Sequence, residues 1–318
     1  MLPRVILLGP QRFRPTVGEV VRDLALEAPF ALITAGWKER EGEDEELRQA
    51  LGRPSYNLGL YAHASALYGE DRELHAAIRA RQTRLRDLQE LYRARLEPAM
   101  DAVYRLEGFV GKEEALVHPE RESALEMVRA LDRHHLGRVG EIREEHRTRH
   151  APLDREPVAR RREAMATRIH QAGAVFIAGG HVALLLNRLR LFDLAPILRH
   201  KLVVAWSAGA MAASERIVLF HDHPPQGRGH AEVLDQGLSL FPGVLPLPHA
   251  SARLHLHDPR RVGVFARRFS DQRSVALDPG ARVAWRAGGW KPHEGVRQLT
   301  AEGVTPWGMT NAPDGDAA

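Results

Sequence analysis

The segment 205–210, with the sequence AWSAGA, carries the side chain best suited to nucleophilic chemistry, Ser207. The apolar run 202–206 predicts a buried strand that ends directly at Ser207, and small residues then begin a helix. In such a strand–turn–helix arrangement, the tight turn lifts the serine above the edge of the sheet. The N–H groups of the helix N-terminus can then stabilise a developing oxyanion. The same spacing also fits a serine that only caps a helix.

The histidine and cysteine content of the chain limits which catalytic mechanisms are possible. A serine hydroxyl is a weak nucleophile until a neighbouring base accepts its proton, and a third group, usually a carboxylate, must orient that base. The chain has 17 histidines and no cysteine. The lack of cysteine excludes a thiol nucleophile, disulfide bonds, cysteine–zinc sites and iron–sulfur clusters.

A histidine-rich stretch covers residues 221–257. It contains His221, His223, His230, His249, His255 and His257. His255 and His257 alternate as they would on one face of a strand, which could in principle collect a metal ion. No accompanying carboxylate pattern supports a metal, so a solvated or substrate-facing loop is the favoured interpretation.

The first 59 residues have the pattern of a strand, a helix and a second strand. The apolar runs Arg4–Gly9 and Phe30–Thr34 predict strands, and Thr16–Leu26 predicts the helix between them. The acidic stretch Glu39–Glu46 is typical of a solvated loop followed by the start of a helix. We expect residues 1–59 to form the first part of an α/β core.

Residues 60–172 are almost entirely helical in pattern. Apolar residues recur at helical spacing over 74–103 and again over 125–142, and a third periodic run covers 155–170. His135 and His146 continue the second run, which favours buried, hydrogen-bonded histidines over a metal site. We predict a helical insertion or cap over 60–172 that could also form a homodimer surface.

Residues 173–310 return to strands and turns. Ala174–Ala178 predicts a buried strand that ends in a double glycine, a helix then extends to Leu198, and Leu202–Trp206 predicts the next strand. Strands that alternate with helices predict an α/β fold with a mostly parallel sheet and helices on both faces, in which ligands bind at the carboxyl ends of the strands. We expect 173–310 to complete the core and 311–318 to form a flexible tail.

Charge and hydropathy favour neither a nucleic acid nor a membrane as a partner. The formal net charge is +4, and arginines are interleaved with acidic residues, as in Asp71-Arg72-Glu73, which is typical of a solvated, salt-bridged helix face. No segment approaches the ~18 consecutive apolar residues of a membrane span. The apolar run that follows Arg4 is too short for a signal peptide, so we expect a cytoplasmic protein.

Four ordered motifs lie in the second half of the chain: FIAGGH at 176–181 with LLL at 184–186, AWSAGA at 205–210, GLSLFP at 237–242, and PH at 248–249. Together they resemble the peptidase E and cyanophycinase family of serine peptidases, which has the class I glutamine amidotransferase-like fold. The resemblance covers residues 174–290, and residues 1–36 show a weaker similarity to the same family. The helical middle has no counterpart in it.

The resemblance implies a role for several residues. Ser207 would be the nucleophile, and His249 would be the general base and later the general acid. The N–H groups of Gly180 and Ala208 would form the oxyanion hole.

The pocket candidates under the same resemblance are Gly179, His181 and Trp206. His181 replaces the family's Asn or Asp-Gln after the double glycine, at a position that borders the substrate, and Ala205 replaces a glycine two residues before the serine. These departures leave the specificity open.

The carboxylate of the triad has two candidates. Asp222 lies fifteen residues after Ser207, as in the family, and within the histidine-rich stretch. Pro224, Pro225 and Gly227 beside it suggest a mobile loop. Asp278 is the alternative, because it follows the apolar strand Ser274–Leu277, which would hold it more rigidly.

The resemblance implies a serine hydrolase that cleaves a peptide or amide bond of a small substrate through an acyl-enzyme on Ser207. No metal or organic cofactor is implied. Two alternatives stay open: a catalytically inactive ligand-binding protein of the same fold, and an amidase or esterase that acts on a non-peptide substrate.

Overall fold

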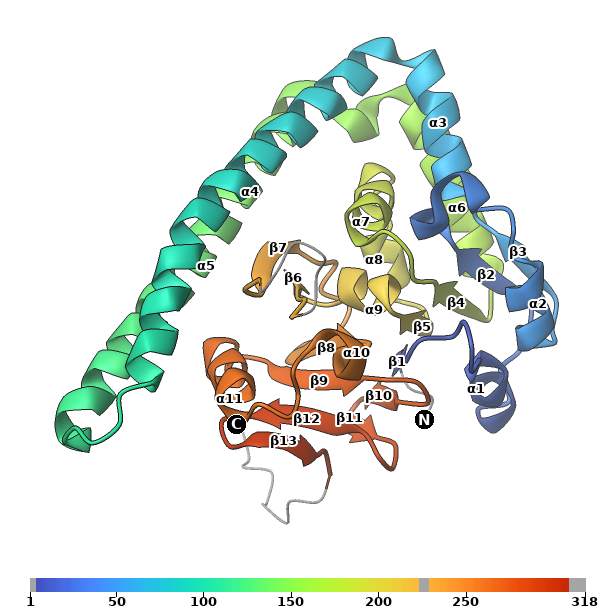
Figure 1. Ribbon diagram of the computed structural model, residues 1–318. Coiled ribbons are helices and arrows are strands. Elements are labelled where there is room, and N and C mark those ends of the chain that lie inside the picture. The colour runs from blue at the N-terminus through green and yellow to red at the C-terminus, as the bar shows by residue number, and fades with distance from the viewer. Residues whose placement is uncertain (1–3, 223–228, 309–318) are drawn as a thin grey trace.

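The computed structural model describes residues 4–222 and 229–308 (Figure 1). The strands are β1 (Val5–Leu8), β2 (Phe30–Ile33), β3 (Ser55–Asn57), β4 (Ala174–Ile177), β5 (Val203–Trp206), β6 (Arg216–Leu219), β7 (Glu232–Gln236), β8 (Val244–Pro248), β9 (Arg273–Leu277), β10 (Arg282–Arg286), β11 (Gly289–Pro292), β12 (Arg297–Thr300) and β13 (Gly303–Pro306). The α-helices are α1 (Val17–Asp23), α2 (Glu45–Leu51), α3 (Leu60–Glu70), α4 (Arg72–Glu107), α5 (Glu114–His150), α6 (Glu156–Gln171), α7 (Val182–Leu191), α8 (Ala195–Leu198), α9 (Ala208–Ala213), α10 (Ala250–Arg253) and α11 (Pro259–Arg268). Two 3₁₀ helices are η1 (Ala35–Arg40) and η2 (Pro152–Asp154).

The central sheet has seven strands in the order β11-β10-β1-β5-β4-β2-β3. The pairs from β1 through β5, β4 and β2 to β3 are parallel, whereas β10 joins β1 antiparallel. β1, β2, β4 and β5 are buried along their whole length, as expected for parallel strands covered on both faces. α1 and α2 pack on one face, and α7 and α9 pack on the other. The prediction of an α/β fold with a mostly parallel sheet and helices on both faces is confirmed.

Two smaller sheets follow the core. β8 and β9 run parallel in the sheet β13-β12-β9-β8, in which Pro248 is the register partner of Leu277. β6 and β7 form an antiparallel pair. The β8–β9 pairing matters for function, because it brings the residues that follow each strand, His249 and Asp278, to the same edge.

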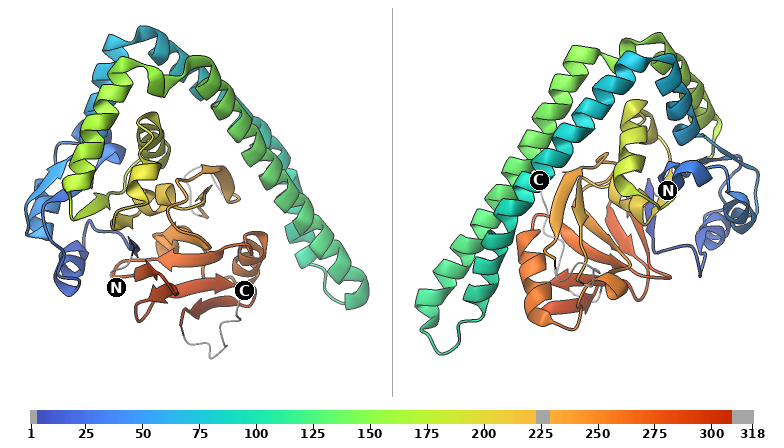
Figure 2. Two further views of the ribbon diagram at one scale, coloured as in Figure 1. Left: turned by 180° about the vertical axis from the view of Figure 1, so that it is seen from behind. Right: turned by 45° about the horizontal axis from the view of Figure 1, so that its top comes forward.

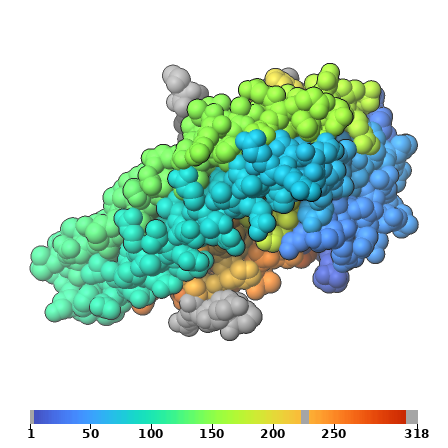
Figure 3. Space-filling model, turned by 90° about the horizontal axis from the view of Figure 1, so that it is seen from above, coloured from blue at the N-terminus to red at the C-terminus, as the bar shows by residue number. Residues whose placement is uncertain are grey.

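The helical region forms a long antiparallel pair, α4 and α5, between α3 and α6 (Figures 1 and 2). Asp71 begins α4 by accepting a hydrogen bond from the Leu74 N–H at 2.9 Å, which satisfies an N–H that lacks an intrahelical partner. The apolar faces expected from the sequence are buried, since Tyr92, Leu96 and Val128 are each at most 3% exposed. Seen from above, the pair crosses one face of the molecule, and its tip extends past the core (Figure 3).

The division into 1–59, 60–172 and 173–310 stays a prediction, as does a homodimer through the helical region. Several large apolar side chains of the helix pair and its tip are exposed: Leu91, Phe109, Val110, Leu116 and Met127. The expected tail, 311–318, lies outside the described residues.

Two element boundaries differ from the sequence-based expectation. The single helix expected to reach Leu198 is divided into α7 and α8, because Asp193 adopts φ +43°, which a continuous helix does not allow. α1 ends at Asp23, close to Ala25 with φ +47°. Within the described residues, no helix is both long and apolar enough to cross a membrane.

Candidate active site

Ser207 lies on a strained turn between β5 and α9, with φ +50° and ψ −125°. A non-glycine residue at positive φ costs of the order of 1–3 kcal/mol and persists only when its surroundings enforce it. Small residues make this turn possible. A Cβ on Gly209 would lie 2.2 Å from the Ile177 carbonyl oxygen, so no larger residue fits there without displacing the backbone of β4. The strand–turn–helix context predicted for Ser207 is therefore present.

His249 faces Ser207 across the edge of the sheets. Its Nε2 lies 3.5 Å from the Ser207 Oγ, at the upper limit for a hydrogen bond, as is common in active sites without substrate. His249 follows β8 and adopts a left-handed conformation, with φ +57° and ψ +35°. Its N–H donates to the Leu277 carbonyl of the neighbouring strand at 3.1 Å, which fixes the backbone at this turn.

Burial is the main cause that lowers the pKa of His249 below its ordinary value. The positive charge of Arg253 lowers the pKa further, and the negative charge of Asp278 opposes both effects. A lowered pKa keeps the imidazole neutral at neutral pH, which is the state that can accept a proton from a serine.

The double glycine after β4 packs directly against Ser207. A Cβ on Gly179 would lie 2.7 Å from the Ser207 Cβ and 3.7 Å from the Ala208 nitrogen. Gly180 has φ +113°, and a Cβ there would lie 2.3 Å from the Gly36 carbonyl oxygen. Ala208 begins α9, so its N–H has no acceptor within the helix. The geometry allows the oxyanion hole predicted from Gly180 and Ala208, and their role stays a prediction.

The Asp222 side chain is buried, and its hydrogen-bond partners are residues other than His249. Its carboxylate accepts hydrogen bonds from the Arg261 guanidinium and, at 2.8 Å, from the His255 N–H. Its own N–H donates to the Arg253 carbonyl at 2.7 Å. None of these contacts within the described residues reaches His249. The neighbouring Pro224, Pro225 and Gly227 lie outside the described residues.

Asp278 lies next to the turn that carries His249. Its carboxylate accepts hydrogen bonds from the Ser251 N–H at 2.9 Å, the Ser251 hydroxyl at 2.7 Å and the Arg297 guanidinium at 2.6 Å. Of the two candidate carboxylates, Asp278 is the one whose charge acts on the pKa of His249.

Sequence reasoning missed Ser251 and Arg297. Ser251 could have been suspected from its place two residues after His249. Nothing in the sequence around Arg297 points to the site, because β12 reaches Asp278 only through sheet pairing.

The pocket candidates lie on opposite sides of the turn. His181 caps α7, its Nδ1 accepting from the Leu184 N–H at 3.3 Å. Trp206 is 5% exposed and packs in the cluster beneath α1 and α2, on the other face of the sheet from His249.

Two histidines of the helical region, His135 and His146, are buried. His135 Nε2 lies 3.0 Å from the Gln89 Oε1, and His146 Nδ1 lies 3.3 Å from the Arg81 guanidinium. The sequence interpretation of both as buried, hydrogen-bonded residues is confirmed. Over residues 4–222 and 229–308, no group of three or more His, Asp or Glu side chains is arranged to hold a metal ion.

A family model and a solved structure are similar to this chain. The model of peptidase family S51 matches residues 141–286, which include Ser207, His249 and the double glycine. The crystal structure of a peptidase from an acI-B1 Actinobacterium is similar to this chain at 14% identity and a TM-score of 0.44, covering 95% of this chain and 92% of that one. Among curated proteins, no significant match was found. The predicted resemblance to the peptidase E-like family is confirmed by the family match, which indicates a peptidase-type hydrolase.

Proposed function

We propose, from the match of residues 141–286 to peptidase family S51, that this protein is a serine hydrolase that cleaves a peptide or amide bond of a small substrate. The observation that carries the proposal is the pairing of Ser207, on a strained turn at the end of a parallel strand, with the His249 Nε2 at 3.5 Å. A helix-capping serine needs neither the positive φ nor a histidine partner.

The reaction follows from this arrangement. His249 Nε2 accepts the hydroxyl proton as Ser207 Oγ forms a bond to the scissile carbonyl carbon. The N–H groups of Gly180 and Ala208 stabilise the oxyanion. When the intermediate collapses, the bond to the leaving nitrogen breaks and His249 gives its proton to the departing amine. Water then attacks the acyl-enzyme by the same steps in reverse and releases Ser207.

Asp278 is the better candidate for the acid that assists His249. Its charge favours the imidazolium that forms in each transition state, and Ser251 and Arg297 hold the carboxylate in place. Asp222, the first choice from the sequence, is occupied by Arg261 and by the His255 N–H.

Labelling with a fluorophosphonate probe tests the proposal. We expect one adduct, located on Ser207 by peptide mapping, and no adduct on the Ser207→Ala variant. Ser65→Ala is a matched control, because Ser65 is an exposed residue of α3 whose hydroxyl bonds only the Tyr61 carbonyl among the described residues.

The site of labelling distinguishes the possible functions. An adduct at another serine, or no adduct under conditions that label a known serine hydrolase, contradicts the catalytic role of Ser207 and leaves a ligand-binding protein of the same fold. If Ser207 is labelled, short peptides and non-peptide amides or esters offered as substrates distinguish a peptidase from an amidase or esterase.

A further inference from the structure

A large cleft opens beside the candidate oxyanion hole, on the face of the sheet away from His249. Its volume is about 670 Å³, within the range typical of small-molecule sites. The walls come from the loop after β1, the start of η1, helix α2, and the two residues Gly180 and Trp206. The loops at the carboxyl ends of β1, β2, β4 and β5 therefore all contribute to it, and these elements lie together in Figure 1.

The cleft and the candidate catalytic turn share backbone. Gly180 lines the cleft and is also a candidate donor of the oxyanion hole. Trp206 lines it and directly precedes Ser207. A substrate whose carbonyl lies at Gly180 would therefore have a neighbouring residue at the mouth of this cleft.

The walls of the cleft are aromatic and carry balanced charge. Phe13, on the loop after β1, lines the cleft and is 92% exposed, so its ring is accessible to a ligand. Trp37 is partly exposed at the cleft, and the largely buried Trp206 lies at its base. The charged side chains at the cleft are two arginines and two glutamates, Arg12, Arg40, Glu43 and Glu46. Arg40 pairs with Glu43 at 2.6 Å, so the cleft offers no net charge to a ligand.

The aromatic walls are held firmly relative to the oxyanion hole. The Gly36 carbonyl accepts a hydrogen bond from the His181 N–H at 2.8 Å, which ties η1 to the double-glycine turn. Lys38, next to Trp37, adopts φ +61° and ψ −127°, a strained conformation of the kind that gathers at functional sites. On the opposite wall, Gln11 orders the loop after β1, because its Oε1 accepts from the N–H groups of Thr16 and Val17 at 2.7 and 3.0 Å.

We propose that this cleft is a specificity site that binds a large aromatic side chain of the substrate, next to the residue whose carbonyl occupies the oxyanion hole. The inference rests on the proposed function. It adds a substrate class, peptides with an aromatic residue at one side of the scissile bond, that the catalytic residues alone do not imply.

The first experiment compares substrates. Pairs of short peptides differ only by phenylalanine or alanine at the residue before, or the residue after, the scissile bond. We expect kcat/KM to favour phenylalanine by roughly 10- to 100-fold at one of the two positions, as burial of a large apolar side chain predicts. We expect the F13A variant to reduce that ratio several-fold. F109A is the matched control, because Phe109 follows α4 at the tip of the helix pair, and it should leave the ratio unchanged.

The second experiment measures binding without turnover. The Ser207→Ala protein is titrated with the phenylalanine and alanine peptides, and tryptophan fluorescence is followed. We expect the fluorescence of the Ser207→Ala protein to change in a saturable way with the phenylalanine peptide. The affinity for this peptide should be weaker in a double variant that carries both Ser207→Ala and F13A. Equal kcat/KM values for both peptides at both positions, together with no saturable change, would overturn the proposal.

The two proposals fail separately. If fluorophosphonate labels Ser207 but the titration and the rate ratio show no aromatic preference, the cleft proposal is wrong and the hydrolase proposal stands. If Ser207 is not labelled while the phenylalanine peptide still binds in the titration, the hydrolase proposal is wrong and the cleft is supported as an aromatic-binding site.

Discussion

The turn at Ser207 and the helix pair α4–α5 are ordered by different interactions. Around Ser207 the structure depends on close backbone approach: Gly179, Gly180 and Gly209 each lie where a Cβ would meet neighbouring atoms at 2.7 Å or less. The segment 205–210 contains neither an arginine nor a carboxylate. The backbone can pack this closely only because these three positions are glycines, which have no Cβ. The turn therefore depends on glycine and not on a buried charge.

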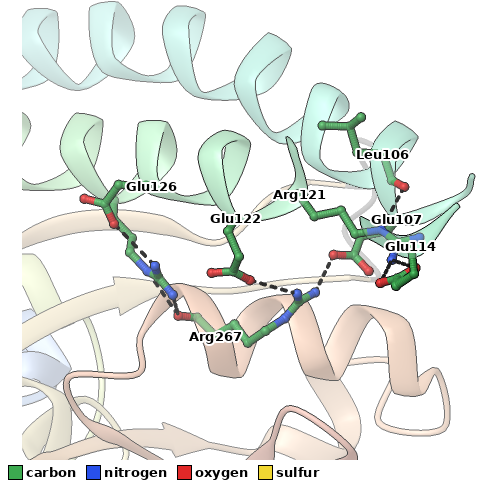
Figure 4. A network of polar contacts seen from close by, with 8 residues as sticks. Leu106, Glu107, Glu114, Arg121, Glu122, Glu126 and Arg267 are labelled. Atoms are coloured by element: carbon green, nitrogen blue, oxygen red, sulfur yellow. Dashed lines mark hydrogen bonds and ion pairs between the residues drawn. The ribbon is translucent and has the colours of Figure 1, made fainter. Parts of the chain in front are cut away.

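The helix pair α4–α5 is instead attached to the core by arginines. Arg268 of α11 is 3% exposed and donates to Asp132 of α5 at 2.7 Å and to the Tyr92 hydroxyl of α4 at 2.9 Å. Asp235 of β7 binds Arg143 of α5 and Arg190 of α7. Near the tip, Arg267 reaches Glu107 and Glu122 on the two helices (Figure 4).

This contrast predicts where substitutions act. Charged groups taken out of water depend on their partners, so the loss of one partner in the helix pair costs stability. The turn at Ser207 carries strain rather than ion pairs, and within the described residues His249 takes part in no ion pair, so we expect changes at Ser207 or His249 to alter activity with little cost to folding.

The largest effect is expected from Ser207→Ala. Because nucleophile and base act as one unit, we expect Ser207→Ala, His249→Ala and the double variant each to lower kcat by about the same factor, on the order of 10⁴ or more. Steady-state kinetics on one substrate measures this. A double variant much worse than either single variant would show that the two residues do not act together. The free energy of unfolding should change by less than about 1 kcal/mol for Ser207→Ala.

Asp132→Ala should cause the largest loss of stability. It leaves the buried Arg268 without its carboxylate, and removal of one partner of a buried pair costs about 3–5 kcal/mol. Urea denaturation measures the change. Glu141→Ala is the matched control on the same helix, because its pair with Arg138 is exposed and should cost less than about 1 kcal/mol. Similar losses for both variants would contradict the contrast between buried and exposed pairs.

Acid should destabilise the helix pair through His146. Burial, with the charges of Arg81 and Arg143 and of His150, lowers the pKa of His146 to about 4, against an ordinary value of 6.5. Between these two values the unfolded chain binds the proton more readily, so the free energy of unfolding falls as the pH falls from 6.5 to about 4. The loss is at most about 3 to 4 kcal/mol, since one pKa unit is about 1.4 kcal/mol.

Denaturation at a series of pH values measures this effect. His146→Gln removes the titrating group and should flatten the profile over that range. A profile unchanged by the substitution would assign the acid sensitivity to other groups.

Asp278 and Asp222, the two candidate carboxylates, should differ in their effect on activity, although each effect is smaller than that of Ser207→Ala. Asp278→Asn removes a charge that raises the pKa of His249, so the acidic limb of kcat/KM should move to lower pH, with a loss in kcat of about 10- to 100-fold. Arg253→Gln removes a charge that lowers the same pKa, so its limb should move to higher pH. Asp222→Asn should act mainly on stability. A larger kcat loss for Asp222→Asn than for Asp278→Asn would restore Asp222 as the orienting acid.

The smallest effect is expected at the tip of the helix pair. Arg267→Ala removes partly exposed contacts to Glu107 and Glu122, so we expect a loss of about 1 kcal/mol or less in the free energy of unfolding. Hydrogen exchange should show faster exchange confined to the tip and no change at β5. Faster exchange at β5 would mean that the helix pair directly supports the turn at Ser207.

Local sequence was enough to predict the fold class and the turn that carries Ser207. Apolar runs that end in small residues predicted β4, β5 and the turn at Ser207, because a parallel strand and a tight turn each depend on a few consecutive residues. The spacing of Tyr92, Leu96 and their neighbours predicted the long helix in the same way. Each of these features depends on residues that are close together in the chain, so a single sequence is enough to predict it.

The tertiary structure decided which residues surround Ser207. Asp278 acts on His249 because β8 pairs with β9, and Arg297 reaches Asp278 because β12 pairs with β9. Phe13, Trp37 and Trp206 meet in one cleft only because three strands end at the same edge of the sheet. Contacts between residues tens to hundreds of positions apart depend on strand order and register, and no local pattern encodes them.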